Sequence, residues 1–301
     1  VPLRCAETYT PRWANSPLRD TPERPRGMYA FRFVSALLLA AGPLASAAQE
    51  PTTRQLNLLG WQEFAEIMER GEIETVLIPT GTLEPHGVLP NGSDNLAPQA
   101  MAAELAPRLN ALVAPTLNYG FTGSFAAFPG NLSISEATYE AFVEEIFEGL
   151  AGNGFLNIIV INGHGGGQTA VLSRVAERIS GEHRVRTLVS NWWSATSDIT
   201  FDVFGEDGGH AGNNESAYIQ AIAPEHVHPE RYSADMAEAR MGGINAYPFP
   251  SSIVLYQAGQ GYPDFDSADA AEYFRRVNDR MGDLIADHIR RWDLAGIYRD
   301  R

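Results

Sequence analysis

The sequence contains no lysine. All 22 basic residues are arginines, against 37 aspartates and glutamates, and the formal net charge is −15. Schiff-base catalysis and the phosphate-binding lysine of a P-loop both require a lysine side chain, so these classes of enzyme are excluded. No run of arginines forms a basic segment of the kind that follows a phosphate backbone. We therefore expect no nucleic-acid partner.

Cysteine is almost absent. Cys5 is the only one, and it lies in a segment that we expect the mature protein to lack. The mature chain would then have no disulfide, no thiolate nucleophile and no cysteine metal ligand. Any metal ion must be bound by histidine, aspartate and glutamate.

Long apolar runs are also lacking. The run at residues 33–42 is too short to span a bilayer. It follows the positively charged stretch Met28–Arg32 and precedes the small residues Ala45-Ser46-Ala47, which form a cleavage pattern. Residues 28–47 are therefore predicted to be a signal peptide. A buried helix is the alternative, although Pro43 would interrupt it.

The signal peptide divides the chain into three parts. Residues 1–27, rich in proline and arginine, are predicted to be a non-native upstream extension, and residues 48–301 the mature domain. We expect the mature protein to be periplasmic or secreted, with no membrane attachment after the signal is cleaved. No internal repeat or low-complexity linker interrupts the mature part, so we expect a single domain there.

Short β-rich runs alternate with longer helical patterns along the mature domain, as in a parallel sheet covered by helices. The run Ile158–Ile161 is apolar throughout, which is typical of a strand buried on both faces. We predict a three-layer α/β/α sandwich with a mostly parallel central sheet. The predicted strands are 75–82, 111–118, 157–162, 184–190 and 252–257. The predicted helices are 61–70, 95–109, 136–150, 168–179, 215–222 and 268–291, with residues 133–136 as a capping box for the third.

Glu84 and His86 follow the first predicted strand, at the edge of the sheet where open α/β folds bind ligands. Side chains two residues apart in an extended chain point the same way, so both can face one pocket. Asp94 follows where the next helix opens, and two acids with an imidazole suit a divalent ion such as zinc, manganese or iron. On this segment alone, a helix N-cap at Asp94 and a surface turn at His86 explain the residues equally well.

His164 lies between glycines directly after the buried strand 157–162. Glycine permits positive φ and close approach of the backbone to a bound group. A phosphate-binding loop is the alternative, but the spacing is not that of a dinucleotide fingerprint and the histidine would occupy the place of the pyrophosphate. The segment therefore favours a metal ligand.

His210 and Glu215 lie on another glycine-rich approach to a predicted helix. A carboxylate in the first turn of a helix is favoured by the helix dipole alone, which accounts for Glu215 without a ligand role. The dipole does not account for His210.

The three segments together resemble those of the creatininase family. The family segments are Gly-x-x-Glu-x-His-Gly with a following Ser-Asp or Thr-Asp pair, then Asn-Gly-His-Gly-Gly-Asn, and then His-Ala-Gly-x-x-Glu-Thr. This chain has, in the same order, Gly81 to Gly87 with Ser93-Asp94, Asn162 to Gly167, and His210 to Ser216. A further similar segment is Phe128-Pro129-Gly130, and the resemblance extends from about Trp61 to Ile222.

The resemblance implies a creatininase-like fold and two divalent metal ions per chain, with zinc as the first choice and manganese or iron as alternatives. One ion would be bound by Glu84 and His164 and the other by His86 and Glu215. Asp94 would bridge the two ions.

The resemblance also implies a catalytic role for His210, in proton transfer or substrate binding, and a homo-oligomer, commonly a hexamer. Creatininase itself has a glutamate ligand two residues after the histidine of the second segment, where this chain has Gly166. Creatininase activity in the strict sense is therefore not implied.

These expectations define a metal-dependent amidohydrolase, in which a water that bridges two metal ions attacks the carbon–nitrogen bond of a small-molecule amide. The alternative is a non-catalytic periplasmic protein of the same fold that binds metal or a small solute. Trp192 and Trp193 could line the pocket or belong to the core. The remaining histidines are predicted to be structural: His183, His226, His228 and His288.

The sequence predicts export. Residues 28–47 should direct the protein out of the cytoplasm and be removed near Ala47. Amino-terminal sequencing of natively expressed protein checks this. A mature chain that still begins upstream of Met28 would show that the segment is not a signal peptide.

Overall fold

A parallel sheet of four strands, in the order β2-β1-β3-β4, lies at the centre of the protein. The structure, a computed structural model, describes residues 50–232, 237–239, 254–256 and 263–300. The predicted extension 1–27 and signal peptide 28–47 lie outside the described residues, and Ala48–Arg301 forms one compact unit. The strands are β1 (Thr75–Thr80), β2 (Ala111–Val113), β3 (Asn157–Asn162) and β4 (Arg186–Asn191).

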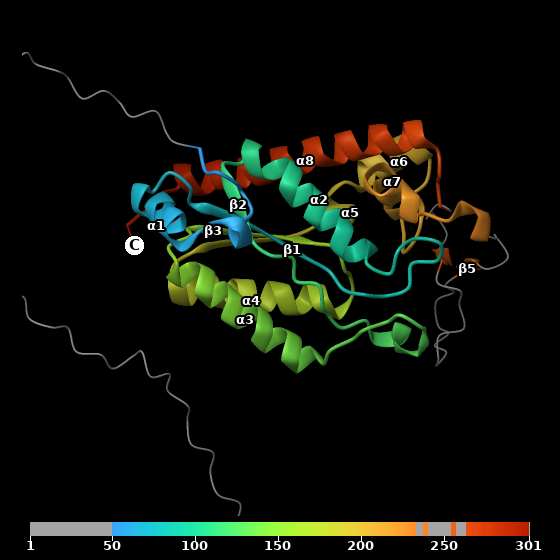
Figure 1. Ribbon diagram of the computed structural model, residues 1–301, viewed down its shortest axis with the longest axis horizontal. Coiled ribbons are helices and arrows are strands. Elements are labelled where there is room, and N and C mark those ends of the chain that lie inside the picture. Colours follow the sequence, from blue (N-terminus) through green and yellow to red (C-terminus); the bar gives the residue numbers. More distant parts are fainter. Residues whose placement is uncertain (1–49, 233–236, 240–253, 257–262, 301) are drawn as a thin grey trace, which may run out of the picture. The chain divides into compact units, whose positions relative to one another are not determined.

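Helices cover both faces of this sheet (Figure 1). The three layers confirm the predicted α/β/α sandwich. The helices packed on one face are α2 (Ser93–Arg108), α5 (Trp192–Ala195), α6 (Ser197–Phe204), α7 (Asn213–Ile222) and α8 (Ser267–Leu294). Those packed on the other are α1 (Trp61–Arg70), α3 (Glu136–Gly152) and α4 (Gly167–His183). Short 3₁₀ turns complete the described elements at Leu56–Leu58, Gly123–Ala127, Pro224–His226 and Pro229–Arg231.

The apolar strands supply both halves of the core, because successive side chains of a strand point to opposite faces. Leu77 and Ile159 pack with Met101 of α2 in one cluster. Val76 and Ile158 belong to the other cluster, with α3 and α4. Strands β1 and β3 are buried along their whole length, and the sequence predicted this for β3.

The direction of the chain across the sheet changes at β1, which pairs with β2 on one side and β3 on the other. The loops after β1 and β3 therefore leave toward opposite faces, α2 following one and α4 the other. A crevice opens outside the carboxyl ends of strands at such a switch point.

Two predicted strands differ from the structure. Regular pairing of β2 ends at Val113 and resumes, shifted by one residue, as an isolated bridge between Thr80 and Leu117. Within the strand predicted over 252–257, the structure describes β6 (Val254–Tyr256). It pairs with β5 (Ala237–Ala239) in a separate two-stranded sheet instead of extending the central one. A hydrophobic pattern identifies a strand but not its partner.

The predicted capping box is wrong by two residues. Helix α3 begins at Glu136, and Ser135 is its N-cap, with Oγ accepting a hydrogen bond from the N–H of Thr138 at 3.2 Å. Ser133 instead accepts a hydrogen bond from the N–H of Thr122 at 3.0 Å, so it is used to fix the preceding loop. Within the described ranges, no helix combines the length and apolar character needed to cross a bilayer.

Replacing Ser135 with alanine should destabilise the protein by about 1 kcal/mol, because two first-turn groups of α3 lose their side-chain partner. Thermal unfolding should then occur roughly 2–4 °C lower. Ser135→Asp is the matched control, since aspartate is an equally good N-cap. An unchanged midpoint in Ser135→Ala would contradict the assignment of the cap.

Candidate metal centre

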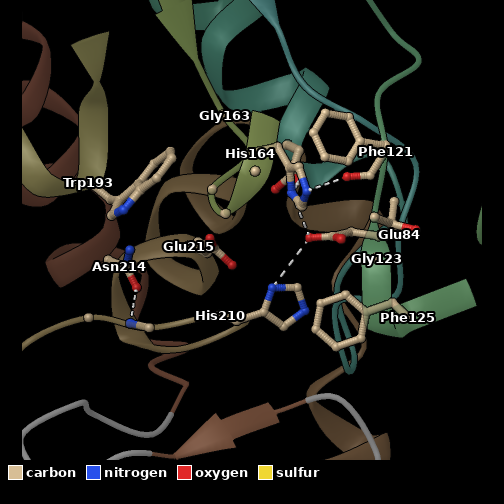
Figure 2. Close-up of a pocket in the computed structure, with 17 residues that line it drawn as sticks. Glu84, Phe121, Gly123, Phe125, Gly163, His164, Trp193, His210, Asn214 and Glu215 are labelled. Atoms are coloured by element: carbon tan, nitrogen blue, oxygen red, sulfur yellow. Dashed lines mark hydrogen bonds and ion pairs between the residues drawn. The ribbon is translucent and has the colours of Figure 1, made fainter. Parts of the chain in front are cut away.

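The switch point of the sheet brings the six candidate residues together (Figure 2). Glu84 and His86 lie in the loop after β1, and His164 follows β3. Asp94 lies in the first turn of α2, Glu215 lies in the first turn of α7, and His210 immediately precedes α7.

Asp94 is held against the backbone at the ends of two strands. A Cβ on Gly81, after β1, would lie 2.1 Å from the carbonyl oxygen of Asp94, and one on Gly163, after β3, would lie 2.0 Å from it. Only glycine leaves room for the first turn of α2 at these positions. Asn95 fixes the same turn by donating its side-chain N–H to the carbonyl oxygen of Thr82 at 2.9 Å.

The candidate ligand atoms form three overlapping groups, each within 4.8 Å. Asp94, Glu84 and His86 each belong to two of them, and Asp94 links the two groups that contain His164 and Glu215. The groups are Glu84, Asp94 and His164; His86, Asp94 and Glu215; and Glu84, His86 and His210. A carboxylate shared by two groups is the arrangement that a bridging ligand requires.

Backbone carbonyls fix the orientation of His86 and His164. Nδ1 of His86 lies 2.9 Å from the carbonyl oxygen of Glu84, and Nε2 of His164 lies 3.2 Å from that of Phe121. Since a carbonyl only accepts, these nitrogens carry the protons. The opposite nitrogens face the two oxygens of Asp94, each at 2.9 Å, so that a proton or a metal ion can lie between nitrogen and oxygen. A hydrogen bond from the other ring nitrogen to a backbone carbonyl is the usual second contact of a metal-binding histidine.

The carboxylates of the cluster strongly stabilise positive charge between them. Burial disfavours protonation of His86 and His164, but the facing carboxylates outweigh burial and raise the pKa of each to about 10. Burial, reinforced by Asp94, raises the pKa of Glu84, and burial also raises that of Glu215 to about 7. Burial also disfavours ionisation of Asp94, but His86 and His164 outweigh it and lower its pKa. Protons or metal ions between nitrogens and oxygens supply this charge.

A divalent ion fits the donor set. Oε2 of Glu84 is buried and receives no hydrogen bond from any residue in the described part of the chain. A buried carboxylate oxygen without a partner is costly unless a cation faces it. Carboxylates and imidazoles together suit zinc and manganese.

His210 is oriented differently from the other two histidines. Its Nε2 donates to the carbonyl oxygen of Pro85 at 2.7 Å, and its Nδ1 lies 3.5 Å from Oε1 of Glu84. The ring stacks on Phe125, with centroids 4.8 Å apart, and contacts His86 at 4.4 Å. Burial, aided by the charge of His86, lowers the pKa of His210 to about 3, so its ring is neutral.

A cavity of about 420 Å³ opens on the cluster. Its walls include Trp193 and the loop after β2, which contributes Phe121, Thr122 and Phe125. Sequence reasoning left Trp193 undecided, and the structure shows that it lines the cavity while Trp192 is buried in the core. It missed the loop residues, although the signal was present: aromatic side chains among glycines, directly after a strand that ends at the same edge.

The other four histidines lie outside the ligand groups and are exposed or partly exposed: His183, His226, His228 and His288.

The fold and the cluster define an α/β protein with a candidate metal centre at the carboxyl ends of its central strands. Residues 57–285 match the family model described as creatininase, creatinine amidohydrolase, and the chain belongs to this family. The chain is 27% identical to the creatinine amidohydrolase of Pseudomonas putida over 191 residues, which are 58% of this chain and 73% of that protein. It is 29% identical to the mycofactocin precursor peptide peptidase of Mycolicibacterium smegmatis over 236 residues, 73% of this chain and 86% of that protein.

Solved structures share the fold. A crystal structure of creatinine amidohydrolase (creatininase) superposes with a TM-score of 0.68 at 22% identity, covering 79% of this chain and 98% of that one. A structure described as "Creatininase Mn" gives 0.65 at 24% identity with the same coverage.

Replacing Gly163 with alanine should displace Asp94, because the new methyl group would overlap its backbone. We expect a lower unfolding temperature and loss of most bound zinc, measured by thermal unfolding and by elemental analysis after dialysis. Gly149→Ala in α3, where a Cβ meets nothing within 4 Å, is the control and should change neither. Full zinc binding by a folded Gly163→Ala protein would disprove the close fit.

Proposed function

We propose that this protein hydrolyses carbon–nitrogen bonds of amides with the help of two divalent metal ions. The observation that carries the proposal is the position of Asp94. Its two carboxylate oxygens face imidazoles that come from different strand loops, each at 2.9 Å, and it belongs to two ligand groups.

The chain offers three ligands to each ion. Glu84, Asp94 and His164 would hold one, and His86, Asp94 and Glu215 the other. Zinc is the first choice for these ligands, with manganese or iron as alternatives, and the manganese form of a solved relative supports this range. Two such ions, when bound, would supply a water of lowered pKa and polarise the amide carbonyl.

His210 is suited to move the proton of the reaction. Nε2–H donates a hydrogen bond to the carbonyl oxygen of Pro85, so the lone pair lies on Nδ1, which is 3.5 Å from Oε1 of Glu84. With the ions bound, Nδ1 would take a proton from the attacking water and return it to the departing nitrogen, a transfer typically worth a factor of about 10²–10⁴ in rate. The contact with Phe125 keeps the ring in this orientation.

The two named relatives point to the reaction more strongly than to one substrate. One is named for creatinine and the other for a precursor peptide, and both names describe cleavage of an amide bond. We therefore propose for this chain the type of bond that the relatives cleave. The rest of its substrate depends on the shape of its own cavity.

Asp94→Asn and His210→Gln should separate metal binding from proton transfer. The wild-type protein should contain close to two ions per chain by elemental analysis. Asp94→Asn removes the charge between them, so at least one ion should be lost. His210→Gln removes none of the six proposed contacts to the ions and should keep both, while turnover of an amide falls by roughly 10²–10⁴.

The exposed His226 offers the control, since His226→Gln should change neither quantity. Retention of both ions in Asp94→Asn would refute the bridging role. A wild-type protein that binds two ions but cleaves none of a panel of lactams, formamides, cyclic ureides and short peptides would favour a binding protein over an enzyme.

A further inference from the structure

The cavity has aromatic side chains on both sides of the ligand cluster. Figure 2 shows Trp193 on one side, and Phe121 and Phe125 on the other, with His164, Glu215 and His210 between them. An amide whose carbonyl lies at the cluster would therefore extend its acyl and amine substituents toward aromatic walls.

A wall of bare backbone joins the two sides. A Cβ on Gly165 would lie 3.6 Å from Trp193, and one on Gly167 would lie 2.7 Å from the ring of Phe121. Between them, Gly166 has φ 61° and ψ −139°, a conformation that side chains other than that of glycine rarely adopt, and a Cβ there would meet nothing within 4 Å. The run of glycines thus places a strip of bare backbone between Trp193 and Phe121, with open space at Gly166.

Charge is confined to the cluster. Among the described residues that line the cavity, the acidic side chains are the three carboxylates of the ligand groups, and no arginine is present. The groups of a substrate that extend beyond the scissile bond thus meet aromatic rings, peptide backbone and the uncharged side chains of Thr122 and Asn214. Burying a charge against such a surface without a partner is unfavourable.

We infer that the substrate is an open-chain secondary amide that carries an uncharged apolar group, aromatic for the best fit, on each side of the scissile bond. This rests on the proposed function. The cavity volume of about 420 Å³ lies within the range that encloses drug-sized ligands, whereas a formamide or a small lactam would leave both aromatic sides uncovered. A planar group also stacks favourably on indole and phenyl rings.

The inference is tested with four matched amides and their ketone isosteres, in which CH₂ replaces the amide N–H. The amides are N-methylacetamide, N-benzylacetamide, N-methylphenylacetamide and N-benzylphenylacetamide. The corresponding ketones are butan-2-one, 4-phenylbutan-2-one, 1-phenylbutan-2-one and 1,4-diphenylbutan-2-one. Calorimetry of the zinc-loaded and the metal-free protein measures ketone binding independently of turnover. Each phenyl group should tighten binding by about tenfold or more, and the two contributions should multiply.

Gly165→Val locates the effect. Valine beside Trp193 should remove at least most of the advantage of one phenyl group while preserving that of the other and the zinc content. Gly181→Val, on the exposed end of α4 where a Cβ meets nothing within 4 Å, is the matched control and should behave as wild type. Equal binding of all four ketones would overturn the inference.

A second result would also overturn it. The N-terminus of α4 lies at the glycine strip, and backbone N–H groups there could hold a carboxylate instead of an apolar group. Tighter binding of the 4-carboxyphenyl analogues than of the phenyl ketones would establish that alternative. Binding of the ketones to metal-free protein tests the shape of the substrate independently of hydrolysis. Failure to hydrolyse the amides, with ketone binding as expected, would therefore count against the proposed function and not against this inference.

Discussion

The buried carboxylate of Asp94 is the constraint on which the rest of the site depends. It lies between two imidazoles at 2.9 Å, in the first turn of α2, and the backbone of that turn contacts glycines at the ends of β1 and β3. Removing such a charge from water costs several kcal/mol unless cations surround it. The helix, the two strand ends and the two imidazoles therefore form a single unit, in which none can shift without leaving the carboxylate without its partners.

Main-chain atoms set the geometry of the histidines. Each of His86, His164 and His210 donates one ring N–H to a backbone carbonyl, so its orientation depends on the path of the loops after β1 and β2. A side-chain partner could adopt another rotamer, but a carbonyl moves only with its loop. Preorganisation of this kind would let the site bind ions without first rearranging. Without it, repulsion among the three carboxylates would favour a rearrangement of the site.

The sequence predicted the parts of the structure that depend on local pattern. The apolar runs predicted the two central strands, and their alternation with helical patterns predicted the sandwich. The six polar residues cluster because parallel strands end at one edge of the sheet. The sequence could not predict contacts that depend on distant packing. The cap of α3 moved to Ser135 because Ser133 is used by the loop of Thr122, and β6 pairs with β5 outside the central sheet. Phe125 was missed for the same reason, since its partner His210 lies far along the chain.

The metal cluster and the cavity wall are built from separable parts of the chain. The ligands depend on strand ends and glycines that contact Asp94, where a single methyl group does not fit. A Cβ would meet open space at Gly166 and only the ring of Trp193 at Gly165, and the aromatic sides contact the ligands through the ring of Phe125 and the carbonyl of Phe121. Side chains along the strip can therefore differ between proteins while the ligands stay in place. Such a separation would allow one family to include relatives named for substrates as different as creatinine and a precursor peptide.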